Sequence, residues 1–129
     1  MDSANIAAIV HLARMDIIES KNESARVFLN EKLLEFPQNA IIMAEISDSF
    51  LLENNYSDAL LWVEKSYAQA PKNFYILAKY SNILMLTNES AKAVELVDFY
   101  LGQNGGSLQA LRLIATLYQR QNQHEQAIL

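Results

Sequence analysis

The sequence contains no cysteine and little glycine or proline, and these shortages limit which folds and which kinds of active or metal site are possible. Among its 129 residues there are 3 Gly, 2 Pro and no Cys. The lack of cysteine excludes disulfide bonds, thiolate metal sites and a cysteine nucleophile. So few helix-breaking residues, in a chain that is 51% hydrophobic, favour a helical globular fold over a disordered or all-β chain.

Positive charge and long apolar runs are also scarce. The chain has 10 Lys and Arg against 15 Asp and Glu, a net charge of −5, whereas a nucleic-acid partner needs a basic surface. No apolar run approaches the roughly 18–20 residues that span a bilayer, and the N-terminal apolar segment is interrupted by His11 and Arg14. We expect no nucleic-acid partner and no membrane insertion. The expected location is the cytoplasm, or the periplasm if a signal peptide preceded this sequence.

Catalytic motifs are missing as well. The sequence contains no phosphate loop, no nucleophile elbow and no cluster with the spacing of metal ligands. His11 and His124 are far apart in the chain and are not expected to meet. We therefore predict that the protein is not an enzyme, with no catalytic residue, no cofactor and no metal site.

What the sequence does contain is a period of 34 residues. Four alanines are spaced at this interval, and two further in-phase series are made of small residues and of helix-ending residues. The three series are Ala25, Ala59, Ala93 and Ala127; Ala13, Ser47, Ser81 and Ala115; and Pro37, Pro71 and Gly105. A fixed period of this size is typical of solenoids, in which each repeat is one supersecondary unit.

Each repeat reads as two amphipathic helices. In the second repeat, Met43, Ile46 and Phe50 follow the i, i+3, i+7 spacing of one helical face. Asparagine tolerates the left-handed conformation that ends many helices, so the asparagines that follow the first helices predict stops there. These are Asn54, Asn88 and Asn122. The second helices are expected at residues 23–36, 57–70 and 90–103, and the small residues of the two series are expected where the paired helices cross closely.

These residues carry a family resemblance. The chain resembles the tetratricopeptide repeat family, whose units are 34-residue helix–turn–helix pairs. The second repeat matches the family pattern best, at Met43, Ile46, Ser47, Phe50, Ala59, Val63, Ser66 and Pro71. The resemblance implies an all-α fold, a right-handed α-solenoid of antiparallel helix pairs. It would form a single domain over residues 1–129, with repeats at about 6–39, 40–73 and 74–107 and an incomplete repeat at 108–129.

The resemblance also implies a binding surface, because the first helices of this family line a concave groove. Carried over by repeat position, the groove is largely apolar in the first three repeats and polar and basic in the fourth. The predicted groove residues are Val10, Arg14, Ile17, Ile41, Asp48, Leu51, Leu52, Tyr75, Asn82, Met85, Leu86, Arg112, Thr116 and Arg120. Some of the apolar ones could instead pack between neighbouring first helices.

The predicted function is a non-catalytic scaffold or adaptor that binds a peptide or amphipathic helix of another protein in this groove. Members of the family that bind chaperone tails use Lys and Asn at two positions of their first repeat, which here hold Val10 and Arg14, so that ligand is not expected.

The alternative function is a self-associating structural module, a homodimer formed through the C-terminal helices, as part of a bacterial envelope or secretion apparatus. The last first-helix carries an apolar stripe, which includes Leu111 and Tyr118, and the sequence after it is too short for a stable isolated helix. Either the chain is a fragment of a longer array or another molecule covers this stripe.

Overall fold

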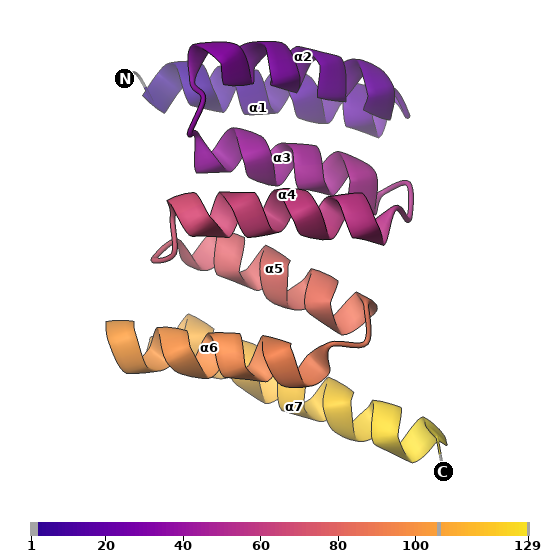
Figure 1. Ribbon diagram of the computed structural model, residues 1–129, viewed down its shortest axis with the longest axis vertical. Coiled ribbons are helices and arrows are strands. Elements are labelled where there is room, and N and C mark those ends of the chain that lie inside the picture. Colours follow the sequence, from indigo (N-terminus) through magenta and orange to yellow (C-terminus); the bar gives the residue numbers. More distant parts are fainter. Residues whose placement is uncertain (1–2, 106, 129) are drawn as a thin grey trace. The chain divides into compact units, whose positions relative to one another are not determined.

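The computed structural model describes residues 3–105 and 107–128, and all regular structure in them is α-helical. The helices are α1 (Ser3–Ile18), α2 (Asn22–Glu35), α3 (Ala40–Leu51), α4 (Tyr56–Gln69), α5 (Phe74–Leu86), α6 (Ser90–Asn104) and α7 (Leu108–Ile128) (Figure 1). The prediction of an all-α fold is confirmed, and the second helices of the first three repeats begin and end within one residue of their predicted bounds.

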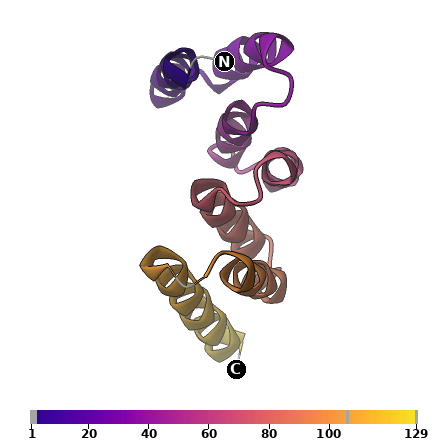
Figure 2. The same ribbon diagram turned by 90° about the vertical axis from the view of Figure 1, so that its left-hand side faces the viewer.

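The chain divides into two compact units, Met1–Ala70 and Pro71–Leu129, and each is described by itself. In the first unit the antiparallel pair α1–α2 is followed by the antiparallel pair α3–α4, which Figure 2 shows nearly end-on. In the second unit α6 packs on both α5 and α7.

The small residues of the period lie at the helix crossings, as their spacing indicates. Ala25, Ala59 and Ala93 are fully buried on the second helices. Ser47, from the other small-residue series, is also fully buried, and its hydroxyl donates a hydrogen bond of 2.7 Å to the carbonyl oxygen of Ala59. A larger side chain at either residue would push α3 and α4 apart.

Asparagine defines both ends of several helices. Asn39, Asn55 and Asn73 are N-caps whose side-chain oxygens accept hydrogen bonds from backbone N–H groups of the first turn. Asn54 and Asn88 have positive φ angles of 60° and 64°, in the left-handed conformation that lets the chain turn back. Both therefore end first helices, as predicted.

Asn122 does not end a helix, and this prediction is wrong. α7 runs without interruption from Leu108 to Ile128 (Figure 1). A left-handed turn costs backbone strain, which the preceding repeats offset by packing a second helix such as the 14-residue α4 onto the first. After Asn122 the chain instead continues α7, so its backbone hydrogen bonds are made within the helix.

Candidate protein-binding surface

A pocket of about 290 Å³ lies between α1 and α3 in the first unit. We call it the α1–α3 pocket. Most of its exposed wall is apolar, and a charged group closes one side. Its lining residues are Arg14, Ile17, Ile18, Glu45, Asp48, Leu51 and Leu52.

Helical spacing explains why these side chains converge. Arg14, Ile17 and Ile18 follow i, i+3, i+4 spacing on α1, which places them on one face near the C-terminal end of that helix. The residues from α3 follow the same rule, ending at Leu51 and at Leu52 just beyond it. Because α1 and α3 pack against each other, the two faces form one surface. The structure therefore brings together five residues of the predicted groove: Arg14, Ile17, Asp48, Leu51 and Leu52.

An ion pair forms the polar side of this pocket. The Arg14 guanidinium donates two hydrogen bonds to the Glu45 carboxylate, from Nη2 to Oε1 at 2.7 Å and from Nε to Oε2 at 3.2 Å. Glu45 is 1% exposed, whereas the Arg14 side chain is 51% exposed. Glu45 was not among the predicted groove residues, because a glutamate inside an apolar helical run is typical of a solvated position. The signal available was its position one turn from Asp48, on the side of α3 that faces α1.

Two predicted groove residues lie in the core of the first unit instead. Val10 is 8% exposed and belongs to the hydrophobic cluster with Ile6, Ile9 and Ala13, and Ile41 is half-buried against this cluster. The reason is that α1 and α3 are in direct contact near their N-terminal halves. Val10 and Ile41 therefore contribute to the packing between α1 and α3.

In the second unit, α5 contributes the apolar members of the predicted surface. Tyr75 and Leu86 are 41% and 43% exposed, and Met85 is half-buried. Lys79 lies over the Tyr75 ring, with 4.6 Å between Nζ and the ring centroid. This contact is a cation–π interaction, so the exposed aromatic side chain is held by a neighbour one turn away.

The polar members of the second unit are partly linked to each other. Arg120 on α7 donates a hydrogen bond of 3.1 Å from Nη1 to Oδ1 of Asn82 on α5. The Thr116 hydroxyl donates to the backbone carbonyl of Arg112, at 2.9 Å. Arg112, Thr116 and Arg120 are all exposed. α7 therefore presents two exposed guanidinium groups, and one of them is oriented by α5.

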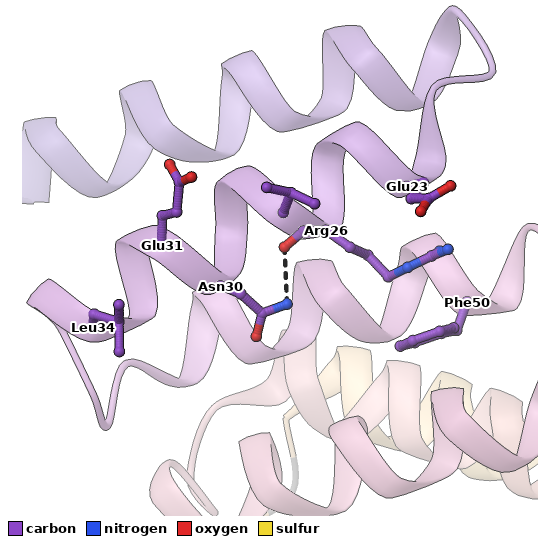
Figure 3. Close-up of a pocket in the computed structure, with 7 residues that line it drawn as sticks. Glu23, Arg26, Asn30, Glu31, Leu34 and Phe50 are labelled. Carbon is purple, nitrogen blue, oxygen red and sulfur yellow. Dashed lines mark hydrogen bonds between the residues drawn. The ribbon is translucent and has the colours of Figure 1, made fainter.

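A second hollow, of about 660 Å³, lies along the outer side of α2. Figure 3 shows it with Arg26 stacked over the Phe50 ring, 4.3 Å from the ring centroid. The Arg26 guanidinium also pairs with the Glu53 carboxylate, and Asn30 Nδ2 donates to the backbone carbonyl of Arg26. These contacts connect Arg26 of α2 to α3 and to the turn that follows α3.

Two side chains outside the α1–α3 pocket have shifted pKa values. The hydrogen bond from Lys21 to Glu19 raises the pKa of Lys21, and burial raises the pKa of Tyr67 above its usual 10.0.

Among residues 3–105 and 107–128, no group of three or more His, Cys, Asp or Glu side chains could hold a metal ion. Within the same described ranges, no helix is long and apolar enough to cross a membrane.

Comparison with known families identifies the repeat. The family model described as anaphase-promoting complex, cyclosome, subunit 3, which is of the tetratricopeptide type, matches residues 53–129, more than half of the chain. The chain belongs to this tetratricopeptide repeat family. The seven described helices correspond to about three and a half repeats, as predicted. No curated protein matches the sequence significantly.

Solved tetratricopeptide repeat domains share the fold at low sequence identity. The second such domain of human RPAP3, in complex with the HSP70 peptide SGPTIEEVD, has a TM-score of 0.67 at 15% identity, over 84% of this chain and 90% of that one. The domain of Sgt2 from Aspergillus fumigatus has a TM-score of 0.74 at 14% identity, over 93% and 81%. The first domain of Spaghetti, bound to the HSP90 peptide SRMEEVD, has a TM-score of 0.73 at 10% identity, over 92% and 97%.

Proposed function

We propose that this protein is a non-catalytic adaptor that holds a peptide or amphipathic helix of another protein, and that the α1–α3 pocket is part of its binding surface. The proposal rests on the exposure of large apolar side chains around this pocket. Ile18 is 81% exposed and Leu52 is 62% exposed, although burial of such side chains is favourable by about 1.5–3 kcal/mol each. Clustered exposed apolar residues of this kind mark interaction surfaces.

The similar solved structures support a peptide ligand in general terms. Domains of RPAP3 and Spaghetti with this fold are bound to peptides of HSP70 and HSP90. Our proposal differs in the ligand, because those peptides end in acidic residues. In this chain Val10 is buried and Arg14 is paired with Glu45, so the two positions that grip chaperone tails in the family are occupied by core packing and an ion pair.

The charges around the pocket favour a basic flank on the ligand. Glu45 and Asp48 supply two carboxylates against the one guanidinium of Arg14, so the formal charge of the lining is 1 − 2 = −1. In the second unit, Arg112 and Arg120 are exposed and favour an acidic group. The ligand we propose therefore places apolar side chains at helical spacing and carries Lys or Arg beside the part that fills the α1–α3 pocket.

Fluorescence titration with a labelled amphipathic peptide tests this function. The probe is a 15-residue helix of Leu and Lys with Leu at i, i+3, i+4 and i+7. Leu52→Glu and Ile18→Glu should each weaken its binding at least tenfold, because both side chains line the α1–α3 pocket. Leu34→Glu is the matched control, because Leu34 is 84% exposed but lines the second hollow, on the outer side of α2. Binding that is indifferent to Leu52→Glu and Ile18→Glu, or weakened only by Leu34→Glu, rejects the α1–α3 pocket as the site.

Self-association is a second candidate function, favoured by one observation on α7. The side chains of Leu111 and Tyr118 are 49% and 48% exposed, and Ala115 between them is exposed as well. A homodimer through this face would bury them. Sedimentation velocity over a concentration series tests it, and a constant monomer mass contradicts it.

A further inference from the structure

Among the described residues, one apolar and exposed helix face lies at each end of the repeat pattern. On α1, Leu12 and Met15 are 54% and 48% exposed, and Ala8 one turn earlier is also exposed. On α7 the corresponding stripe is Leu111, Ala115 and Tyr118. We call these the α1 face and the α7 face.

The period shows what is missing from the α1 face. The residues 34 positions later on α3 are Ile42, Ile46 and Ser49, and all three are 0% exposed. In the first unit, α2 packs on α3, and the short connection between them makes the two helices antiparallel. The α1 face therefore lacks an antiparallel helix of the kind that α2 provides for α3.

The α7 face lacks an equivalent partner. The residues 34 positions earlier on α5 are Leu77, Ser81 and Leu84, again all 0% exposed. In the second unit, α6 packs antiparallel on α5. The opposite side of α7 is already occupied, since Ala110 and Leu117 are 0% and 1% exposed. The α7 face is therefore a second apolar side on the same helix.

The two faces complement each other in size. In an antiparallel arrangement, one register places Ala8 opposite Tyr118, Leu12 opposite Ala115 and Met15 opposite Leu111. Each alanine then faces a large side chain, which is the alternation that lets facing helices interdigitate. Two α7 faces paired symmetrically about Ala115 would place alanine opposite alanine at the centre.

The two faces also complement each other in charge. α7 carries Arg112 and Arg120 and no acidic residue between Leu108 and Asn122. The C-terminal half of α1 carries Asp16, and antiparallel pairing brings that half beside Arg112.

From these observations we propose that the α7 face of one copy docks on the α1 face of a second copy, head to tail. The inference rests on the second candidate function, self-association, and specifies its geometry. In this contact, α7 of one copy covers the α1 face of the next copy as α2 covers α3, and α1 covers the α7 face as α6 covers α5. Because the two surfaces differ, the contact is heterologous, and it continues into an open series of copies unless the rotation between them closes a ring.

The test is a mixing experiment on the 129-residue chain by sedimentation velocity. The wild type should increase in mass with concentration and pass beyond the dimer, in multiples of 14.6 kDa. Leu12→Glu removes only the α1 face and Ala115→Glu only the α7 face, so each variant alone should be monomeric. An equimolar mixture should form a discrete dimer, because one variant keeps the α7 face and the other keeps the α1 face.

Two control variants, Ala7→Glu and Gln109→Glu, change exposed residues on the other sides of the same helices. Both should assemble like the wild type, and circular dichroism should show each variant folded.

Three outcomes overturn the inference. A symmetric α7 contact would leave Leu12→Glu dimeric, and the mixture would give no more dimer than Leu12→Glu alone. Assembly that survives both substitutions would keep self-association but reject this geometry. A wild type that stays monomeric up to millimolar concentration rejects both self-association and this head-to-tail geometry. Peptide binding by the Leu12→Glu variant would still test the adaptor function separately.

Discussion

The Ser47 hydroxyl on α3 donates a hydrogen bond to the backbone carbonyl of Ala59 on α4 across 2.7 Å. Both residues are fully buried, and they belong to the two small-residue series. This contact fixes how closely the helices of one repeat approach each other. It also links the period of the sequence directly to the packing of the fold.

The first prediction concerns overpacking at such a crossing. Ala93 is fully buried on α6, whereas Ala91 on the same helix is exposed. Ala93→Leu should lower the free energy of unfolding by about 1–3 kcal/mol, because the larger side chain has no space at the crossing. Ala91→Leu should change it by less than about 0.5 kcal/mol. Thermal and urea denaturation measure both, and equal effects of the two substitutions would refute the packing role of Ala93.

A second prediction contrasts two asparagines at the same repeat position. Asn54 has a φ of 60°, so Asn54→Ala should destabilise the fold by up to about 1–2 kcal/mol, because alanine lacks the short polar side chain that lets asparagine adopt the left-handed conformation. Asn122 lies inside α7, so Asn122→Ala should be neutral or stabilise the helix by up to about 0.7 kcal/mol. Urea denaturation measures both signs. A loss of stability from Asn122→Ala comparable to that from Asn54→Ala would contradict the continuous α7.

The third prediction concerns the ion pair beside the α1–α3 pocket. Arg14→Ala leaves the buried Glu45 carboxylate without its guanidinium and should cost about 1–3 kcal/mol, with the lower end favoured because Arg14 is half exposed. Arg14→Lys should recover part of this loss, since it restores the charge but not the two-point geometry. Denaturation midpoints measure the difference. Identical stability of wild type and Arg14→Ala would show that the pair contributes nothing to the fold.

The fourth prediction concerns alkaline pH. Burial raises the pKa of Tyr67 in the folded chain above 10.0, so the folded state disfavours the phenolate. This contribution to stability is fully present below pH 10 and is lost as the pH rises through the folded pKa, because the unfolded chain releases the proton first. The stability of Tyr67→Phe should therefore decline less steeply above pH 10 than that of the wild type. Denaturation at pH 9, 10 and 11 measures the two slopes, and parallel slopes would contradict this role.

The period alone was enough to predict the helix pairs, because packing at the crossings repeats with the sequence. It failed at Asn122, where residue type alone favoured a stop. Whether a left-handed turn forms depends on the packing of the helix that follows it, and that is a tertiary property. Repeat position assigned Arg14, Asp48 and Leu52 to the predicted groove, and in the structure all three line the α1–α3 pocket.

Repeat position could not separate the groove from the core at Val10 and Ile41. Both positions line a groove only where the first helices diverge, and here α1 and α3 pack directly together. Glu45 was missed for a related reason, because its burial depends on the arginine that reaches it from α1.

Intermolecular nuclear Overhauser effects between the 15-residue Leu/Lys peptide and methyl-labelled protein would show directly whether the peptide occupies the α1–α3 pocket. We expect contacts from the peptide leucines to methyl groups of Ile17, Ile18, Leu51 and Leu52 around this pocket. Contacts confined to Val27 and Leu34 on the outer side of α2, or none at saturating peptide, would contradict it.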